Sequence, residues 1–164
     1  MKSVRNLGEL GLTLQKIVTR LESNQNLLKL LYYTDKNPLS QPDLTPEDIK
    51  TKIFDKLIKI VPRVGPKETA KSLISLRVVR GRMNSANNEF TDILLGIEVF
   101  VPLTQWMIKD SNLRPFAIMG EIQESLNGKT IDGIGKITGG DFDINFLTDE
   151  ISCYEMTFRT IQYE

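Results

Sequence analysis

Two periods of hydrophobic and polar residues divide this chain into a helical first part and a strand-rich second part. From Leu7 to Leu21 the apolar residues recur every three or four positions, which predicts an amphipathic helix. A second, shorter helix is predicted from Leu27 to Tyr33, and the polar residues 23–26 before it can supply its cap.

A third helix is expected after a loop at residues 34–43 that contains two prolines. Thr45 can cap this helix, and Pro46 suits its first position because that position needs no backbone N–H donor. Apolar residues from Ile49 to Ile60 form its predicted stripe, and the proline that follows is expected to end it.

From Leu73 onward the apolar period is two, which is typical of β-strands. The strand at 90–101 carries apolar residues on both faces, which suits a central strand that is covered on both sides or lies against a neighbouring subunit. A helix at 113–126 interrupts the series, with residues 110–112 as its cap and Asn127-Gly128 as its stop. The strands are expected at 73–80, 90–101, 130–137, 141–147 and 151–163, with a hairpin loop at 82–89 and a turn at Gly139-Gly140.

These elements predict an α+β fold, in which a mostly antiparallel sheet is packed by an amino-terminal helical segment and a central helix at about residues 112–127. The helical segment comprises residues 1–61, and the sheet with its inserted helix comprises residues 72–164. A chain of 164 residues with 40% hydrophobic content can bury one core. We therefore expect a single domain over residues 1–164.

Composition narrows the chemistry that the chain can perform. The sequence has no histidine and one cysteine, so it lacks the commonest general base and the commonest transition-metal ligand. Cys153 has no activating partner in the sequence and is expected to be a buried thiol. We expect no catalytic residues, no cofactor and no metal, and hence no enzyme.

The sequence gives no reason to expect a membrane protein. Its longest apolar runs are shorter than the roughly 18–20 residues that a membrane-spanning helix needs. The start of the sequence lacks the pattern of a secretory signal, so folding in the cytoplasm is expected.

Acidic residues near the carboxyl end are conceivable ligands of a hard cation. Asp132, Asp141, Asp143 and Asp149 lie singly around predicted turns, without the spacing of a calcium loop. Solvated turn residues are the preferred interpretation. A hydrolase or nuclease that uses Asp141 and Asp143 as metal ligands is the third hypothesis for function.

Charge is balanced over the whole chain but segregated along it. The sequence has 21 basic and 21 acidic residues. Residues 50–82 contain ten basic and two acidic side chains, a net charge of +8, whereas residues 139–164 have a net charge of −5. Two solvated faces would explain this, and the alternatives are head-to-tail association of subunits or a surface that binds nucleic acid. The candidate interface residues are Arg63, Lys67, Arg77, Arg80, Arg82, Asp141, Asp143 and Glu155.

The order of elements resembles a known family. A leucine-rich helix leads into residues 27–33 and the proline loop 37–42, and later come a long strand ending in Phe100-Val101-Pro102, the helix 114–126, a strand with Gly133-Ile134-Gly135 and a last strand at 154–158. Together these resemble the neck proteins of long-tailed bacteriophages, especially the tail terminator (tail completion) proteins.

The resemblance implies a structural virion protein made in the host cytoplasm and located in the tail or neck. Such a protein forms a ring, commonly a hexamer, that terminates the tail tube and joins it to the head. The implied partners are further copies of the chain, the tail tube protein, a head-completion or connector protein and DNA in the lumen. The alternative hypothesis is a nucleic-acid-binding accessory or regulatory protein that uses the basic residues 50–82.

Overall fold

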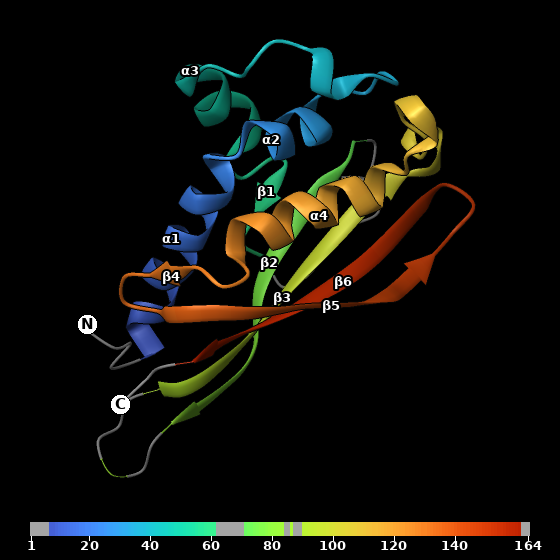
Figure 1. Ribbon diagram of the computed structural model, residues 1–164. Helices are drawn as coiled ribbons and strands as arrows, with labels where there is room; N and C mark the ends of the chain where they lie inside the picture. Colours follow the sequence, from blue (N-terminus) through green and yellow to red (C-terminus); the bar gives the residue numbers. More distant parts are fainter. Residues whose placement is uncertain (1–6, 62–70, 84–85, 87–89, 162–164) are drawn as a thin grey trace.

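A curved sheet with helices packed against one face makes up the molecule (Figure 1). The computed structural model describes residues 7–61, 71–83, 86 and 90–161. The helices are α1 (Leu10–Glu22), α2 (Gln25–Tyr32), α3 (Pro46–Asp48) and α4 (Arg114–Leu126). The strands are β1 (Ile58–Lys59), β2 (Leu73–Met83), β3 (Phe90–Pro102), β4 (Thr130–Ile131), β5 (Gly135–Leu147) and β6 (Ile151–Ile161).

The six strands lie in the order β1-β2-β3-β6-β5-β4. β1 runs parallel to β2, and every other neighbouring pair is antiparallel. Helix α4 lies across the sheet, and α1 and α2 pack beside it (Figure 1). This architecture confirms the predicted α+β class and its mostly antiparallel sheet.

The two faces of the sheet differ because side chains alternate along each strand. On β3, Leu95, Ile97 and Val99 are fully buried and lie on the face that the helices cover, hereafter the helix-covered face. Glu98 and Phe100 lie on the opposite face, hereafter the outer face. The predicted central strand with two partly apolar faces is therefore confirmed as β3, between β2 and β6.

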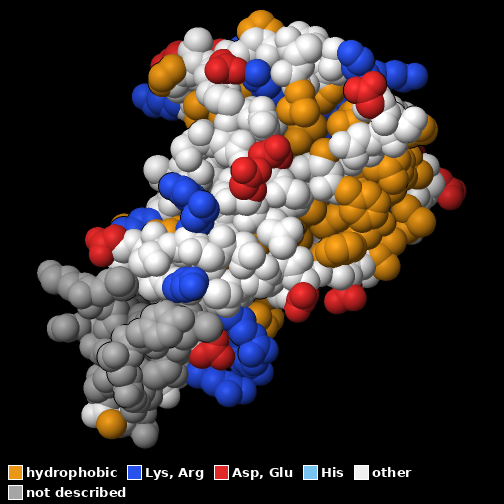
Figure 2. Space-filling view, in the orientation of Figure 1, with side chains coloured by type: hydrophobic (Ala, Val, Ile, Leu, Met, Phe, Trp, Pro, Cys, Tyr) orange, Lys and Arg blue, Asp and Glu red, His pale blue; other side chains and the backbone are white. Residues whose placement is uncertain are grey.

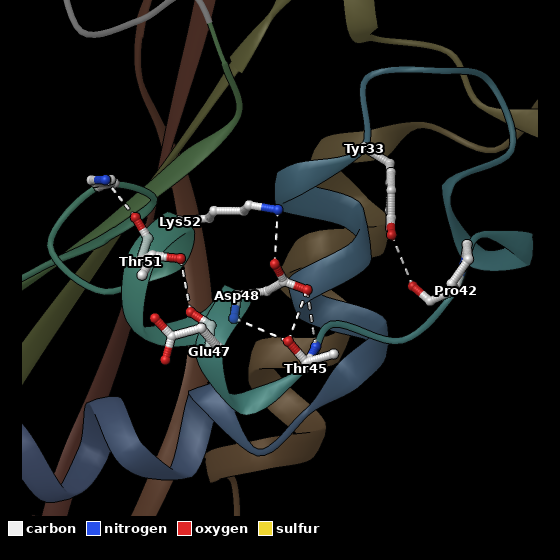
Figure 3. Close-up of polar contacts among 8 residues, drawn as sticks. Tyr33, Pro42, Thr45, Glu47, Asp48, Thr51 and Lys52 are labelled. Carbon is white, nitrogen blue, oxygen red and sulfur yellow. Dashed lines mark hydrogen bonds and ion pairs between the residues drawn. The ribbon is translucent and has the colours of Figure 1, made fainter.

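Side-chain caps define the starts of α2 and α3. The Asn24 side chain accepts a hydrogen bond from the Leu27 N–H at 3.1 Å, which satisfies a backbone donor that the helix itself leaves unpaired. At α3 the Thr45 hydroxyl accepts from the Asp48 N–H, while the Asp48 carboxylate accepts from the Thr45 N–H (Figure 3). Asp48 also forms an ion pair with Lys52 at 2.7 Å.

The predicted third helix is wrong beyond Ile53. α3 continues only as a π-helical turn, Ile49–Ile53, and the chain then reverses through Asp55, whose φ is +55°. The Leu57 carbonyl accepts from the Ile74 N–H, so the next residues join the sheet as β1. Apolar residues spaced for a helix here serve a turn and a short strand, because pairing with β2 outweighs the local helical pattern.

The predicted turn at Gly139-Gly140 is also wrong. Both residues lie inside β5, where they form a bulge opposite β6, with φ of +130° and +113°. A side chain at Gly139 would place its Cβ only 2.6 Å from the Thr157 carbonyl oxygen. Glycine therefore serves close strand contact rather than a reversal of the chain.

Three further boundaries of predicted elements differ from those in the structure. The predicted strand 130–137 is divided into β4 and the start of β5 by a turn at residues 132–134. Arg82 belongs to β2 instead of the hairpin loop, of which residues 84, 85 and 87–89 lie outside the described residues. Helix α4 is confirmed, but Leu113 is its N-cap residue, and Asn112 accepts a hydrogen bond from the Leu113 N–H instead of capping the helix.

Arg114, the first residue of α4, is buried with only 1% of its surface exposed. Its guanidinium donates to the carbonyl oxygens of Leu30 and Tyr33 at 2.7 and 2.8 Å, where α2 ends. It also donates to the carbonyls of Asp35 at 2.6 Å and Gln105 at 2.9 Å. Burial lowers the pKa of Arg114 from its ordinary value, and the nearby Asp35 acts in the opposite direction.

We predict that Arg114→Ala lowers the free energy of unfolding by about 3–5 kcal/mol, because it leaves buried carbonyl acceptors without a donor. Arg114→Lys should recover only part of this loss, since an ammonium cannot span four acceptors as a planar guanidinium does. Urea unfolding gives the free energy of unfolding of both variants. Arg159→Ala, which replaces an exposed arginine on β6, is the control. Equal stability of Arg114→Ala and the wild type would contradict this role.

Candidate interaction surface

Four aromatic side chains from four parts of the chain form one contiguous surface, hereafter the aromatic surface. Phe116 lies 5.5 Å from Tyr154 and 6.1 Å from Phe142 between ring centroids, and Phe142 lies 6.1 Å from Tyr154. Trp106 lies 6.4 Å from Tyr154. Figure 2 shows a broad hydrophobic area on the side where α4 begins and β5 ends.

The aromatic surface is open to solvent although its residues come from well-packed elements. Phe116 is 41% exposed and Phe142 is 49% exposed. Ile144, opposite Tyr154 in the β5–β6 pairing, is 54% exposed and extends the apolar area. Contiguous exposed apolar groups are uncommon on monomeric proteins and mark interaction sites, whereas single exposed apolar residues need no explanation.

The elements beneath the surface explain why these residues protrude. Helix α4 begins at Arg114, and Phe116 lies in its first turn, on the side of the helix that faces away from the buried residues Pro115 and Ile118. Phe142 and Ile144 alternate on β5 with Asp141 and Asp143 and therefore share one face of that strand. The ends of β5 and β6 extend past α4 (Figure 1), which leaves the aromatic side chains at this end of the sheet exposed.

A charge network crosses the outer face of the sheet. Arg77 on β2 contacts Glu155 on β6 at 2.7 Å and Glu98 on β3 at 3.2 Å. Asn145 on β5 donates to the Glu98 carboxylate at 2.8 Å. One cation and one amide thus hold two carboxylates, and the network ties four strands together.

Gly96 makes room for this network. It lies on β3 between Arg77 and Thr157 in the strand register. A Cβ at this position would lie 2.9 Å from a Glu155 carboxylate oxygen and 3.0 Å from Val79. The missing side chain therefore allows Arg77 to reach across the central strand to β6.

Burial changes the acid–base properties of Glu98 and of the nearby Cys153 thiol. Burial raises the pKa of Glu98 from its ordinary value, while Arg77 acts to lower it. Burial likewise raises the pKa of Cys153 to about 12. The thiol is fully buried, as expected from the sequence, and a thiol with this pKa is a poor nucleophile at neutral pH.

The candidate interface residues lie in three places. Arg77 and Glu155 are bound to each other on the outer face. Arg80 and Arg82 are exposed near the end of β2, and Asp141 and Asp143 are exposed on β5. The remaining two candidates, Arg63 and Lys67, lie outside the described residues.

The described residues also bear on metal binding and on membrane insertion. Within residues 7–61, 71–83, 86 and 90–161, no group of three or more histidine, cysteine, aspartate or glutamate residues is placed to hold a metal ion. In the same part of the chain, no helix has the length and apolar character needed to cross a membrane.

Sequence reasoning missed the aromatic surface and Arg114. The strand pattern did place Phe142 and Ile144 on one face of a strand, but it could not show that the helices leave this end of that face uncovered. The arginine at the start of α4 gives no sign of burial in the sequence, because its acceptors are backbone carbonyls more than 70 residues away in three of four cases.

Fold and surface together define a small α+β protein with an exposed aromatic surface beside a charged sheet face. The chain belongs to the YomW family, whose model matches residues 24–160. That family is named after a gene of a phage-like region, which associates the protein with phages. Searches of curated proteins and of solved structures found no match.

We predict that stability depends on pH through Glu98. The folded chain binds the Glu98 proton more tightly than the unfolded chain does, because the pKa is raised from 4.5. The free energy of unfolding should therefore fall as pH rises from the ordinary value through the raised one. Glu98→Gln keeps an acceptor for Asn145 and should gain stability relative to the wild type over that interval.

Urea unfolding between pH 4 and pH 8, roughly the span in which carboxyl groups with ordinary or raised pKa titrate, measures this difference. Glu150→Gln, at an exposed position in the β5–β6 turn, is the control and should follow the wild-type profile. Parallel profiles of Glu98→Gln and the wild type would contradict the prediction.

Proposed function

We propose that this protein is a structural component of a phage virion that forms an oligomeric ring, terminates the tail tube and joins the tail to the head. Membership of the YomW family supports the phage association. The resemblance to tail terminator proteins supports the more specific role. A ring of this kind must bind its own copies and at least one other virion protein.

The aromatic surface is the observation that carries this proposal. Rigid aromatic side chains supply large apolar contact areas at low entropic cost, and they are enriched at the centres of protein interfaces. Asp141 and Asp143 alternate with its β5 members and point to the outer face of the sheet, so they leave the aromatic surface itself apolar. Its partner is therefore expected to present apolar side chains, and we assign this partner to the tail tube.

Sedimentation velocity of the protein alone and with the major tail protein of the same phage tests the proposal. The expected result is a ring-sized oligomer, either alone or on addition of the tail protein. A monomer under both conditions would overturn the proposal.

We further predict that Phe142→Ser combined with Ile144→Ser weakens binding to the tail protein by at least about tenfold, because each truncated anchor at an interface centre costs roughly 1–2 kcal/mol or more. Both side chains are about half exposed, so the folded state should lose little stability. Leu12→Ser, at an exposed position on α1, is the matched control and should leave binding unchanged. Undiminished binding by the double variant would exclude the aromatic surface as the contact.

A second candidate function is nucleic-acid binding, favoured by one specific arrangement. Arg80 on β2 and Arg159 on β6 lie on either side of Leu94 in the strand register and are both exposed. Such basic residues on one sheet face can contact phosphates. DNA binding by the isolated protein that weakens steeply as salt rises, together with a monomeric state, would favour this function over the ring.

A further inference from the structure

Two strands of the sheet have an open outer edge over most of their length. β1 pairs with β2 only at Ile74 and Ser75. β4 pairs with β5 only at Gly135 and Lys136. Among the described residues, no other strand pairs with the outer edges of β2 and β5. An open edge presents unpaired N–H and C=O groups that can add a further strand.

The two open edges carry opposite charges on the same face of the sheet. Asp141 and Asp143 lie opposite Thr157 and Glu155 of β6, on the outer face. Arg80 lies opposite Leu94, which also belongs to the outer face. Arg82 occupies the same side of β2, two residues further on. The β5 edge is thus acidic and the β2 edge is basic.

We infer that the β5 edge of one copy pairs with the β2 edge of a second copy, so that the sheet continues from subunit to subunit. This inference rests on the proposed function and names the contact that builds the ring. Within one chain β5 runs antiparallel to β2, because β2 is parallel to β6 and β6 is antiparallel to β5. Copies that face the same way would therefore form an antiparallel pair, like the other long strand pairs of the sheet.

One register satisfies both charge pairs. If Asp143 lies opposite Arg80 of the second copy, Asp141 lies opposite its Arg82. Neither of these short stretches contains a bulge, since the irregularities fall at 78–80 and 82–83 in β2 and at 139–141 and 144–146 in β5. The residue between the acids, Phe142, then lies opposite Gly81, on the helix-covered face. A glycine leaves space beside it for an aromatic ring from the next strand.

The same register fits the lengths of the two edges. Counted residue for residue, it aligns 140–147 of β5 with 76–83 of β2. The neighbour's β1, which pairs with β2 at residues 74 and 75, then begins where β5 has ended. β4, which pairs with β5 at residues 135 and 136, lies beyond the end of the neighbour's β2. Neither short strand obstructs the pairing.

Charge within a single subunit also favours an external cation at this edge. Asp143 lies directly opposite Glu155, and like charges in that position repel each other. Arg77 contacts Glu155 and Glu98. An arginine from the adjoining copy would place a positive charge on the other side of Asp143 and reduce the repulsion.

Pairing of two different edges is a head-to-tail contact, which closes into a ring when the rotation between copies allows it. A head-to-tail contact predicts a specific pattern of charge reversal. Asp141→Lys with Asp143→Lys makes both edges basic, and Arg80→Glu with Arg82→Glu makes both edges acidic. Each double variant should lose self-association by about 100-fold or more, because like charges then face each other across the contact.

A chain with all four substitutions has a basic β5 edge and an acidic β2 edge, so its self-association should return. An equimolar mixture of the two double variants should also assemble, because every contact then joins opposite charges. Sedimentation velocity measures all four samples. Thermal unfolding checks that each variant is folded, and Lys129→Glu with Lys136→Glu serves as a charge control away from both paired segments.

The outcomes separate this inference from the proposed function. If the wild type stays monomeric with and without the tail protein, the proposed function fails and this contact fails with it. If the wild type forms a ring that the double variants also form, the edge pairing is overturned while the ring function stands. Failure of both the quadruple variant and the mixture to assemble would likewise overturn the pairing, provided that these chains are folded.

Discussion

The guanidinium of Arg114 is the contact on which the arrangement of helices and sheet depends. Its four carbonyl acceptors come from the end of α2, the loop that follows it and the turn after β3. A cation at the carboxyl end of α2 also favours the helix dipole. Because Arg114 is the first residue of α4, the same bonds fix where α4 begins. Phe116 follows two residues later, so the burial of one charged group places the first member of the aromatic surface.

The second constraint is the charge network on the outer face of the sheet. Burial raises the pKa of Glu98 there, while the contact with Arg77 acts to lower it. Glu98 is nearly buried on a face that helices do not cover, and it is held by Arg77 and Asn145. Gly96 is part of this arrangement because any larger residue would enter the space that Arg77 crosses. When one partner of such a network is removed, a buried charge is left without compensation. The resulting loss of stability is larger than the stabilisation that the intact network provides. The central strands are thereby held in one register, and the positions of both sheet edges follow from it.

The sequence predicted the α+β class, the first two helices, α4 and the long strands β2, β3 and β6, because each has a regular apolar period over many residues. It failed where a period was short or ambiguous. The apolar stripe from Ile49 to Ile60 fits a helix. Its last residues instead form β1, because they pair with β2, which follows later in the sequence. Gly139 and Gly140 suggested a turn, although their role depends on the distance to Thr157 in the next strand.

The acidic and basic segments were visible as charge counts, but their place on two open edges required the strand order. The burial of Arg114 could not be predicted, because its acceptors are backbone carbonyls, which every residue has and which no sequence pattern identifies.

An exposed strand edge with apolar residues is a hazard for a monomeric protein, since it invites uncontrolled pairing with other chains. β5 has such an edge, and Phe142, Ile144 and Phe146 are all substantially exposed along it. Charged side chains and bulges limit wrong pairing, and both are present on β5 and β2.

These same features specify a partner when the charges on the two edges are opposite and their lengths agree. A flat, uncharged edge would accept many registers, whereas two aspartates facing two arginines accept one. Assembly of identical copies then covers the edge that would otherwise aggregate. The aromatic surface lies on the other face of the same strand, so a ring built in this way would present it repeatedly around one circumference.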